Sequence, residues 1–509
     1  MEGNGLDLRG LDHPELVIGL VGALGTPLAR VVSMIQAELE SAGYTSEEIR
    51  LSQKLEAYEL PTDHPSSSAS DRTRWEALMD RGNELREALG RGDALAMHAA
   101  ADIRARRPSG GSGTLERTGF VLNQLKHPDE VRLLRRVYGD AFHLVGVFTP
   151  EAKRSEYLRN IKNLSEVDAT ALLERDAGEE VKLGQQVTKT FHLADLFVEL
   201  LNWSDSDVAS ARAQVHRYFD LLFGREIITP TREEYGMFMA HSAALRSADL
   251  SRQVGAAIVT PEDEVIGLGA NEVPKAGGGQ YWEHHRDGRD VDRGFDSNEK
   301  IKRECVEEVA EKLVPEFGDL SPDDRDVHLK KALSDLKGTR LMNLTEFGRA
   351  VHAEMEAILS AARVGVSVRG SRLFTTTFPC HNCAKHIVGA GVASVVYVEP
   401  YPKSLADRLH DDSIAFISGS EDTSGGKVTF SPFSGVAPRR FRKLFSAVAD
   451  DGEKRPRKEK GGAVQVGATA LRLFSSPLSY IEREALVARY LQEFIEELMN
   501  TDLGESTNG

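Results

Sequence analysis

A histidine, a glutamate and two cysteines form the part of this sequence best suited to carry out chemistry. His352 lies upstream of Cys380 and Cys383, which are spaced as Cys-x-x-Cys. Two thiolates and one imidazole supply three ligands to a zinc ion and leave a fourth position for water. At the start of a helix, this cysteine spacing places both sulfurs on one side of the first turn, where the helix N-terminus favours thiolates. We therefore predict an open zinc site made by His352, Cys380 and Cys383.

Glu354, two residues after the histidine, has a different predicted role. Zinc lowers the pKa of a bound water towards about 7, so hydroxide becomes available at neutral pH. Glu354 would take the water proton, deliver it to a ring nitrogen and help ammonia to leave. The whole pattern, His-x-Glu followed by Pro-Cys-x-x-Cys, matches the signature of zinc deaminases. The sequence thus predicts hydrolytic deamination, with Glu354 as the catalytic proton shuttle.

A structural zinc site or a redox pair would use these residues differently. A purely structural zinc site needs a fourth ligand, for which His381 or His386 are the candidates. A redox Cys-x-x-Cys pair has no need of an upstream His-x-Glu. A second metal could bind near 284–290, although polar residues in such a segment more often form an exposed loop; the candidate ligands there are His284, His285, Asp287 and Asp290.

The composition describes a globular chain of several domains. Its 509 residues are 40% hydrophobic and 28% charged, which predicts two or three domains. We find neither an apolar run long enough for a transmembrane helix nor the features of a signal peptide, so we expect a cytoplasmic protein without membrane attachment. The net charge of −16 is poorly suited to binding a phosphate backbone and favours free nucleotides as substrates. Three cysteines do not suggest a disulfide scaffold.

The elements around the metal-binding motif predict one α/β domain over residues 226–450. Their order is helix, β-hairpin, helix, strand, helix, strand. This order predicts a three-layer α/β/α sandwich around a mixed sheet, with the zinc site at two helix N-termini. Beyond it, residues 451–462 form a charged run that we expect to be a solvated loop. Residues 478–500 have the apolar spacing of a helix that packs in a core or at an oligomer contact.

Residues 1–225 predict a parallel α/β domain that opens with a strand, a glycine turn and a helix. The strand covers residues 16–21, and Thr26 is the expected N-cap of the helix. Gly22, Gly25 and Thr26 resemble part of a phosphate-binding loop, but no lysine precedes Thr26. Lys153 and Arg154 do not replace it. Phosphoryl transfer is therefore disfavoured, while degenerate binding of a nucleotide or regulator and a purely structural role both remain open.

The segments 242–275 and 346–402 resemble the deoxycytidylate (dCMP) deaminase family. The resemblance is carried by the runs Ser247–Asp249, Arg252–Ala256, Gly269–Asn271, Phe347–Glu354 and Thr375–Cys383. It implies that Asn271 contacts the sugar hydroxyl of a nucleotide. This sequence has Glu272 where the family usually has glycine, and its insertion before His352 is longer. Substrate contacts are further expected from Ala353, Phe378, Pro379 and Tyr397, although aromatic residues near strand ends are often packing residues, and Lys403 is a candidate phosphate contact.

Most of the chain is also similar to a narrower group, the bacterial antiphage deoxycytidine nucleotide deaminases. These pair a P-loop-kinase-like N-terminal domain with a C-terminal deaminase. The similarity is carried by the runs Gly19–Thr26, Leu125–Glu130, Ala194–Phe197 and Glu399–Ser404, with Arg175–Asp176 and Gly184–Gln185. It implies zinc-dependent deamination of dCTP or dCMP that depletes dCTP during phage infection. It also implies a homo-oligomer, regulated through the N-terminal half by an inhibitory RNA or a nucleotide.

Two other classes of function stay open. A nucleic-acid editing deaminase would need a basic groove, and the acidic balance of the chain counts against one. A zinc-stabilised interaction protein without enzymatic activity would need a fourth protein ligand to the metal.

Overall fold

A computed structural model shows the arrangement of the chain. It describes residues 13–505 except 59, 64–69, 112, 180–182, 284–287, 315, 402–403, 417–424, 449–453, 455–457, 460–461 and 464–476. The chain divides into two compact units, one of Met1–Glu234 with Ser434–Gly509 and the other of Tyr235–Phe433. We expected boundaries at 225 and 450 and a separate C-terminal segment. The structure instead places the C-terminal residues in the first unit, because strand β12 (Gly435–Val436) pairs with a strand of that unit.

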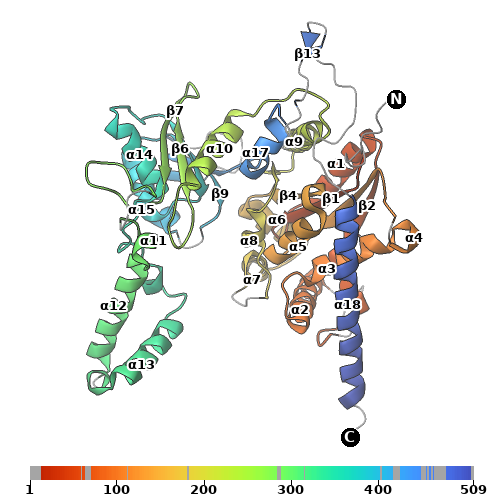
Figure 1. Ribbon diagram of the computed structural model, residues 1–509, viewed down its shortest axis with the longest axis horizontal. Helices are drawn as coiled ribbons and strands as arrows, with labels where there is room; N and C mark the ends of the chain where they lie inside the picture. The colour runs from red at the N-terminus through yellow and green to blue at the C-terminus, as the bar shows by residue number, and fades with distance from the viewer. Residues whose placement is uncertain are drawn as a thin grey trace, which may run out of the picture. The chain divides into compact units, whose positions relative to one another are not determined.

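The first unit is built on a six-stranded sheet in the order β12-β5-β4-β1-β3-β2 (Figure 1). All neighbouring strands are parallel except β12, which is antiparallel to β5. This confirms the predicted parallel α/β class. The parallel strands are β1 (Leu16–Gly22), β2 (Thr45–Arg50), β3 (Thr118–Asn123), β4 (Phe142–Phe148) and β5 (Leu196–Glu199).

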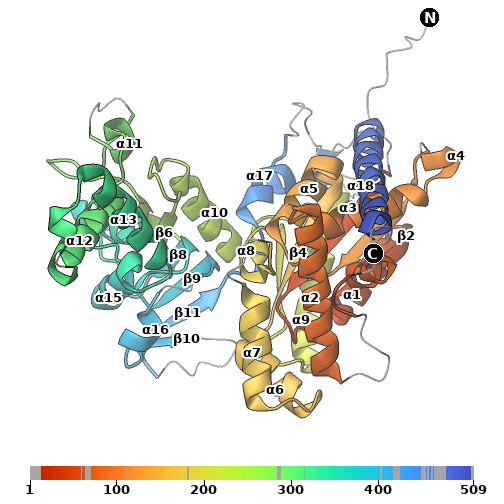
Figure 2. The ribbon, with the colours of Figure 1, turned by 90° about the horizontal axis from the view of Figure 1, so that it is seen from below.

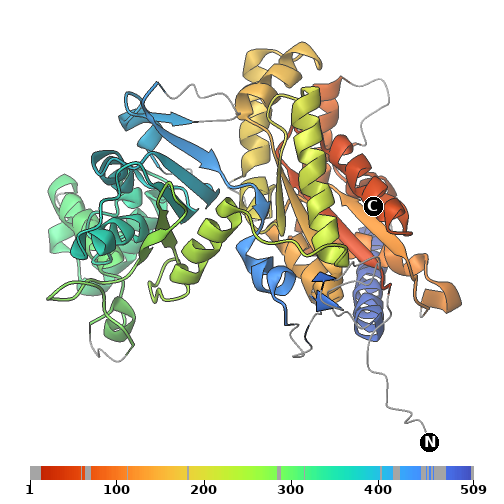
Figure 3. The same ribbon diagram turned by 90° about the horizontal axis from the view of Figure 1, so that it is seen from above.

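Helices cover both faces of this sheet. Helices α1 and α9 contribute to one apolar core with β1 and β4, and both lie over the same face of the sheet (Figure 3). Helix α18 packs against α3 and α5. The helices of this unit are α1 (Leu28–Ser41), α2 (Asp71–Leu89), α3 (Ala94–Ala105), α4 (Pro108–Gly111), α5 (Pro128–Tyr138), α6 (Glu151–Asn160), α7 (Glu166–Ala177), α8 (Val187–Phe191), α9 (Asp205–Phe223), α17 (Pro438–Phe445) and α18 (Pro477–Glu505).

The start of α1 differs from the expectation. Pro27 is the N-cap residue and the helix begins at Leu28, so the predicted cap, Thr26, lies one residue outside. The Thr26 hydroxyl is buried and has no hydrogen-bond partner among the described residues. The expected charged loop at 451–462 falls largely outside the described residues, apart from a short ladder between β13 (Lys458–Glu459) and β14 (Gly462–Ala463).

The second unit has a six-stranded sheet in the order β10-β11-β9-β8-β6-β7 (Figure 2), and its mixture of parallel and antiparallel pairs confirms the predicted mixed sheet. Strands β6 and β7 form the expected hairpin, β8 is antiparallel to β6, and the remaining pairs are parallel. The strands are β6 (Gly255–Val259), β7 (Val265–Ala270), β8 (Arg372–Thr377), β9 (Ser394–Glu399), β10 (Ile414–Phe416) and β11 (Val428–Pro432).

Two glycines let helices approach the two faces of this sheet closely. A Cβ atom at Gly255 would collide with the backbone of α10 (Arg232–Ala244), and one at Gly269 would collide with the backbone of α14 (Ala353–Arg363). In the hairpin, Gly255 lies opposite Ala270 and Gly269 lies opposite Ala256. Because paired residues point to the same face and successive residues to opposite faces, the two glycines face opposite sides of the sheet. Helix α15 (His381–Gly389) packs beside α14. The unit is therefore the expected three-layer sandwich.

A helical insertion separates β7 from α14. It contains α11 (Asp290–Arg293), α12 (Ser297–Leu313) and α13 (Pro322–Asp335), with short 3-10 turns at Phe317–Asp319 and Leu341–Asn343. Helices α12 and α13 pack against each other (Figure 1). The short helix α16 (Ala406–Leu409) follows β9. Within the described part of the chain, none of the helices has the length and apolar character needed to cross a membrane.

Candidate functional site

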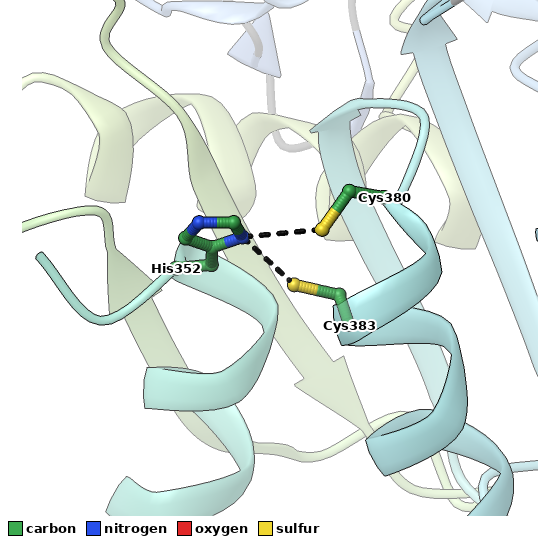
Figure 4. Close-up of side chains that lie close together, drawn as sticks. All are labelled: His352, Cys380 and Cys383. Atoms are coloured by element: carbon green, nitrogen blue, oxygen red, sulfur yellow. Dashed lines mark hydrogen bonds between the residues drawn. The ribbon is translucent and has the colours of Figure 1, made fainter. Parts of the chain in front are cut away.

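The predicted metal ligands meet at the start of two neighbouring helices. His352 is the N-cap residue of α14, and Cys380 is the N-cap residue of α15. Cys383 lies in the first turn of α15, with its sulfur facing the histidine ring (Figure 4). This confirms that the Cys-x-x-Cys spacing coincides with a helix N-terminus.

Pairing of the backbone just before His352 fixes its position. Val351 and Glu272 exchange two backbone hydrogen bonds of 3.1 and 3.3 Å, which ties the start of α14 to the end of the β6–β7 hairpin. The buried Glu272 carboxylate also accepts hydrogen bonds from the Ala248 and Val273 N–H groups. The residue that replaces the family's usual glycine thus organises the loops beside the site.

The three ligand side chains are arranged to bind one ion. Nδ1 of His352 lies 3.3 Å from the sulfur of Cys380 and 3.3 Å from that of Cys383. All three ligand atoms lie within 4.8 Å of one another. Two sulfurs and one imidazole nitrogen at this spacing suit tetrahedral zinc with a fourth position left open. The residues present therefore fit the metal.

The two other histidines of the motif region do not join this cluster. Nδ1 of His386 donates to the Asn382 carbonyl oxygen, and the ring of His381 faces the Glu346 carboxylate at 3.9 Å. Among the residues that the structure describes, the possible metal ligands gathered here are His352, Cys380 and Cys383. Of the residues predicted for a second metal, His284, His285 and Asp287 lie outside the described residues.

Hydrogen bonding within the cluster favours one thiolate. The Cys383 thiol, and then His352, lower the pKa of Cys380 to about 4. The same hydrogen bond to Cys380 raises the pKa of Cys383 far above its usual value. The hydrogen bond between His352 and Cys380 raises the pKa of the histidine to about 9. The cluster thus holds negative charge on the Cys380 sulfur, which suits a cation, and a bound metal would take the place of the proton on His352, because a metal-ligating imidazole is neutral.

Glu354 lies in the first turn of α14, next to this cluster. The residue is 4% exposed, and its Oε2 accepts a hydrogen bond from the Cys383 sulfur at 3.4 Å. Burial, reinforced by the negative Cys380, raises the pKa of Glu354 to about 7. A carboxyl group with such a pKa can both accept and donate a proton near neutral pH.

A cavity of about 340 Å³ lies above the cluster. Its volume is at the lower end of the range for small-molecule sites, roughly 300–1,000 Å³. His352, Glu354 and Cys380 line it together with residues of the hairpin and of the helical insertion. The structure therefore places the metal ligands and the buried carboxyl group in one ligand-sized space.

The expected substrate contacts divide into two groups. Asn271, Ala353 and Phe378 line the cavity. The Asn271 amide bonds to the backbone of the chain before β6, through Val254 N–H at 2.7 Å and the Arg252 carbonyl at 2.8 Å. Tyr397 packs edge-on against the Phe378 ring at 4.9 Å, as aromatic residues near strand ends often do. Pro379 and Tyr397 are not among the cavity-lining residues.

Sequence reasoning missed the contribution of the insertion. Residues 290–302 and 342–345 supply part of the cavity wall. The one sequence feature that could have indicated this contribution is the position of the insertion, directly before the helix whose N-cap residue is His352. Lys403, expected as a phosphate contact, lies outside the described residues.

The glycine turn of the first unit holds an internal carboxylate. The Leu24 N–H donates to Oδ2 of Asp176 at 2.6 Å, and the other oxygen of that buried carboxylate pairs with Lys126. Arg154 contacts the turn through its hydrogen bond to the Leu24 carbonyl oxygen at 3.3 Å. A nucleotide phosphate that used this N–H would have to displace Asp176.

Comparisons with known proteins agree with the geometry of the second unit. Residues 230–399 match the family described as "Cytidine and deoxycytidylate deaminase zinc-binding region". Deoxycytidylate deaminase of Mus musculus is 26% identical over 218 residues, which cover 43% of this chain and 84% of that protein. Deoxycytidylate deaminase of Enterobacteria phage T4 is 46% identical over 54 residues, which cover 11% of this chain and 28% of that protein.

Among solved structures, dCMP deaminase from the cyanophage S-TIM5 in complex with dCMP and dUMP is 20% identical. The match covers 40% of this chain and 98% of that chain, with a TM-score of 0.22. The family match and the curated relatives define the class: the C-terminal half of this chain contains a cytidine and deoxycytidylate deaminase zinc-binding domain.

Proposed function

We propose that this protein is a zinc-dependent hydrolase that converts deoxycytidine nucleotides, dCMP or dCTP, to the deoxyuridine nucleotides and ammonia. One observation carries the proposal. The buried Glu354 carboxyl group lies 3.4 Å from one sulfur of a three-ligand metal cluster, and both line or adjoin one cavity. A structural zinc site would not place an ionisable, unliganded carboxyl group there.

The chemistry assigned to the chain's own residues is proton transfer. Zinc held by His352, Cys380 and Cys383 would supply an acidified water at neutral pH. As the water oxygen bonds to C4 of the cytosine, Glu354 takes the water proton and passes it to the ring nitrogen N3. Glu354 then takes the remaining proton from the new C4 hydroxyl group and transfers it to the amino nitrogen N4. The C4–N4 bond breaks, ammonia leaves with that electron pair, and the C4 carbonyl forms.

The size of the cavity and the charge of the chain support a free nucleotide as substrate. A space of about 340 Å³ suits a single small ligand. The net charge of −16 disfavours an extended nucleic-acid strand. The names of the matched relatives, deoxycytidylate deaminases, support the deoxycytidine nucleotide class.

The biological setting is inferred from the sequence resemblance. We infer that the enzyme depletes dCTP during phage infection and acts as a homo-oligomer. Its N-terminal unit would then serve regulation by an RNA or a nucleotide. The missing lysine before Thr26 and the internal Asp176 carboxylate support a regulatory or structural role over phosphoryl transfer.

The proposal is tested by measuring ammonia release from dCTP, dCMP, cytidine and single-stranded DNA. We expect release from dCTP or dCMP, and a loss of about 10²–10⁴-fold in Glu354→Gln, which keeps the shape of the side chain without its proton transfer. Zinc content of both proteins is measured in parallel and should be equal. Full activity of the variant would exclude the proton-shuttle role, and zinc-free wild-type protein would exclude the metal site.

A further inference from the structure

One wall of the substrate cavity is built by the helical insertion. Asp296, Asn298, Glu299 and Lys302, from the N-terminal end of α12, line the cavity together with the loop 342–345. The ligand His352 and the buried Glu354 line the same space. A ligand that fills the cavity would therefore contact this part of the insertion.

Hydrogen bonds hold this wall in a defined position. The Ser251 hydroxyl donates to Asp296 at 3.3 Å, which joins the insertion to the loop before β6. Arg349 donates to Asp290 at 2.7 Å, which joins it to the segment that leads into α14. Within the wall, the Asn298 amide donates to the Leu344 carbonyl oxygen at 2.9 Å. The wall is therefore preorganised rather than loosely placed.

Two side chains of the wall have hydrogen-bonding groups that their contacts within the protein leave unused. The Lys302 side chain is 7% exposed, and its ammonium group contacts Glu299 and the Met342 carbonyl oxygen, although an ammonium has three N–H donors. The Oδ1 atom of Asn298 is buried and has no hydrogen-bond partner among the described residues. A buried acceptor without a protein partner needs a donor from a water or a ligand, and this one lies on a residue that lines the cavity.

The other charged groups that line the cavity already have protein partners, including Arg252, which pairs with Glu399 at 3.2 Å. Asp290 pairs with Arg349, and Asp249 accepts hydrogen bonds from two backbone N–H groups. Asp296 likewise accepts from the Asn298 and Glu299 N–H groups. The partner of Lys302, Glu299, is 63% exposed, so water screens this ion pair and an anion in the cavity can compete with it. Lys302 is thus a buried cation with an easily replaced partner.

We propose that Lys302 binds the 5′-phosphate of the substrate. We also propose that Oδ1 of Asn298 accepts a hydrogen bond from the sugar hydroxyl, the same group that Asn271 is expected to contact. This inference rests on the proposed deaminase function and names the residues that select a nucleotide over a nucleoside. A deoxycytidine nucleotide offers both groups, an anion and a hydroxyl donor, next to its base.

The test compares substrates with and without phosphate. In Lys302→Gln we expect KM for dCMP, or for dCTP if that is the better substrate, to rise at least tenfold, with kcat within about twofold. The kcat/KM for deoxycytidine should stay unchanged. Lys302→Arg should recover part of the phosphate effect. Lys300→Gln is the matched control, because Lys300 is exposed on the same helix and does not line the cavity, and it should behave as wild type.

A surface variant keeps the test valid if the buried lysine is needed for folding. Glu299→Gln removes the carboxylate that competes with the phosphate for Lys302. KM for the nucleotide should therefore fall two- to fivefold, while KM for deoxycytidine should not change. Calorimetry with dUMP and deoxyuridine on the zinc-loaded protein gives the same comparison without turnover. Equal effects on phosphorylated and unphosphorylated ligands would overturn the assignment. Failure of the proposed function is seen separately, as absence of ammonia release from every substrate by the wild type.

Discussion

The two cysteines and the histidine bind the metal in our proposal, and the neighbouring histidines give a direct control. Cys383 is fully buried with its sulfur 3.3 Å from His352, whereas His386 donates its ring N–H to a backbone carbonyl. We expect Cys383→Ala to lose both zinc and activity. His386→Ala and His381→Ala should retain one zinc per chain and activity within a few-fold of wild type. Zinc is measured by metal analysis of the purified proteins.

Loss of zinc from a His381 or His386 variant would have a definite meaning. It would identify a fourth protein ligand, close the open coordination position and favour the structural zinc site over the catalytic one. The three-ligand geometry predicts the opposite result.

At the end of β5, Glu199 makes stability depend on pH. Burial, and then Asp207, raises its pKa from 4.5 to about 7. Above the unfolded pKa the unfolded chain loses this proton while the folded chain keeps it, so Glu199 lowers stability progressively between pH 4.5 and 7. The shift corresponds to roughly 3 kcal/mol at most. Glu199→Gln should therefore raise the thermal midpoint of the first unit at pH 8, with a much smaller gain near pH 5.

Thermal unfolding of wild type and variant, followed at both pH values, checks this sign. An equal effect of the substitution at pH 5 and pH 8 would show that Glu199 does not hold a raised pKa.

Residues of the catalytic pattern were predictable from sequence because their spacing reflects local geometry. Cys-x-x-Cys occupies one helical turn, and His-x-Glu spans a cap and a first turn. Lys302 and Asn298 were not predictable as cavity residues. Their location depends on long-range hydrogen bonds of the insertion, such as that between Ser251 and Asp296, which no local pattern reveals.

At the scale of elements, Gly269 sets how closely α14 approaches the sheet. A Cβ atom there would lie nearer to the Ala353 carbonyl oxygen than real Cβ atoms approach any heavy atom. In Gly269→Ala, α14 must move away and carry His352 and Glu354 with it. Because small displacements of catalytic groups are costly, we expect activity to fall at least tenfold and zinc to bind more weakly.

Gly389→Ala is the matched control for this effect. Gly389 ends α15, and a Cβ atom there meets no atom within 4 Å. This variant should keep wild-type activity and zinc affinity. Equal activity of the Gly269 and Gly389 variants would show that the site tolerates movement of α14.

Hydrophobic periodicity predicted the opening strand and helix of the first unit and the order helix, hairpin, helix, strand, helix, strand in the second, but not strands β2, β3 or β10 to β12. The ends of predicted elements were also less accurate. The cap of α1 was expected at Thr26, yet Pro27 takes that position. A threonine hydroxyl favours a cap only when the turn before it presents the right backbone angles, and the glycine turn is shaped by Asp176, far along the chain.

At the scale of the whole molecule, the chain returns to its first unit after completing the second. Strand β12 extends the first sheet, and α18 packs against α3. From the sequence we assigned these residues to the second domain and to a separate C-terminal segment. The contacts that place them in the first unit join positions far apart in the chain, so no local pattern reveals them. Arg107, for example, binds Glu15 and Glu484 at 2.6 Å each, and all three side chains are buried.

This buried triad gives a test of how α18 is held. Removing Arg107 would leave two carboxylates facing each other without a counter-charge, which costs roughly 3–5 kcal/mol for a buried ion pair. We therefore expect Arg107→Ala to lower the thermal midpoint of the first unit by several degrees. The exposed pair of Arg132 with Asp129 on α5 supplies the control, since Arg132→Ala should cost less than about 1 kcal/mol.

The charge argument can be separated from the loss of packing by a second substitution. In Arg107→Ala with Glu484→Gln, one of the two opposing charges is gone, so part of the lost stability should return. Thermal unfolding and limited proteolysis of the C-terminal helix measure both variants. If the double variant is no more stable than the single one, the contact of the Arg107 guanidinium with the Tyr480 ring, rather than its pairing with the two carboxylates, holds α18 to the unit.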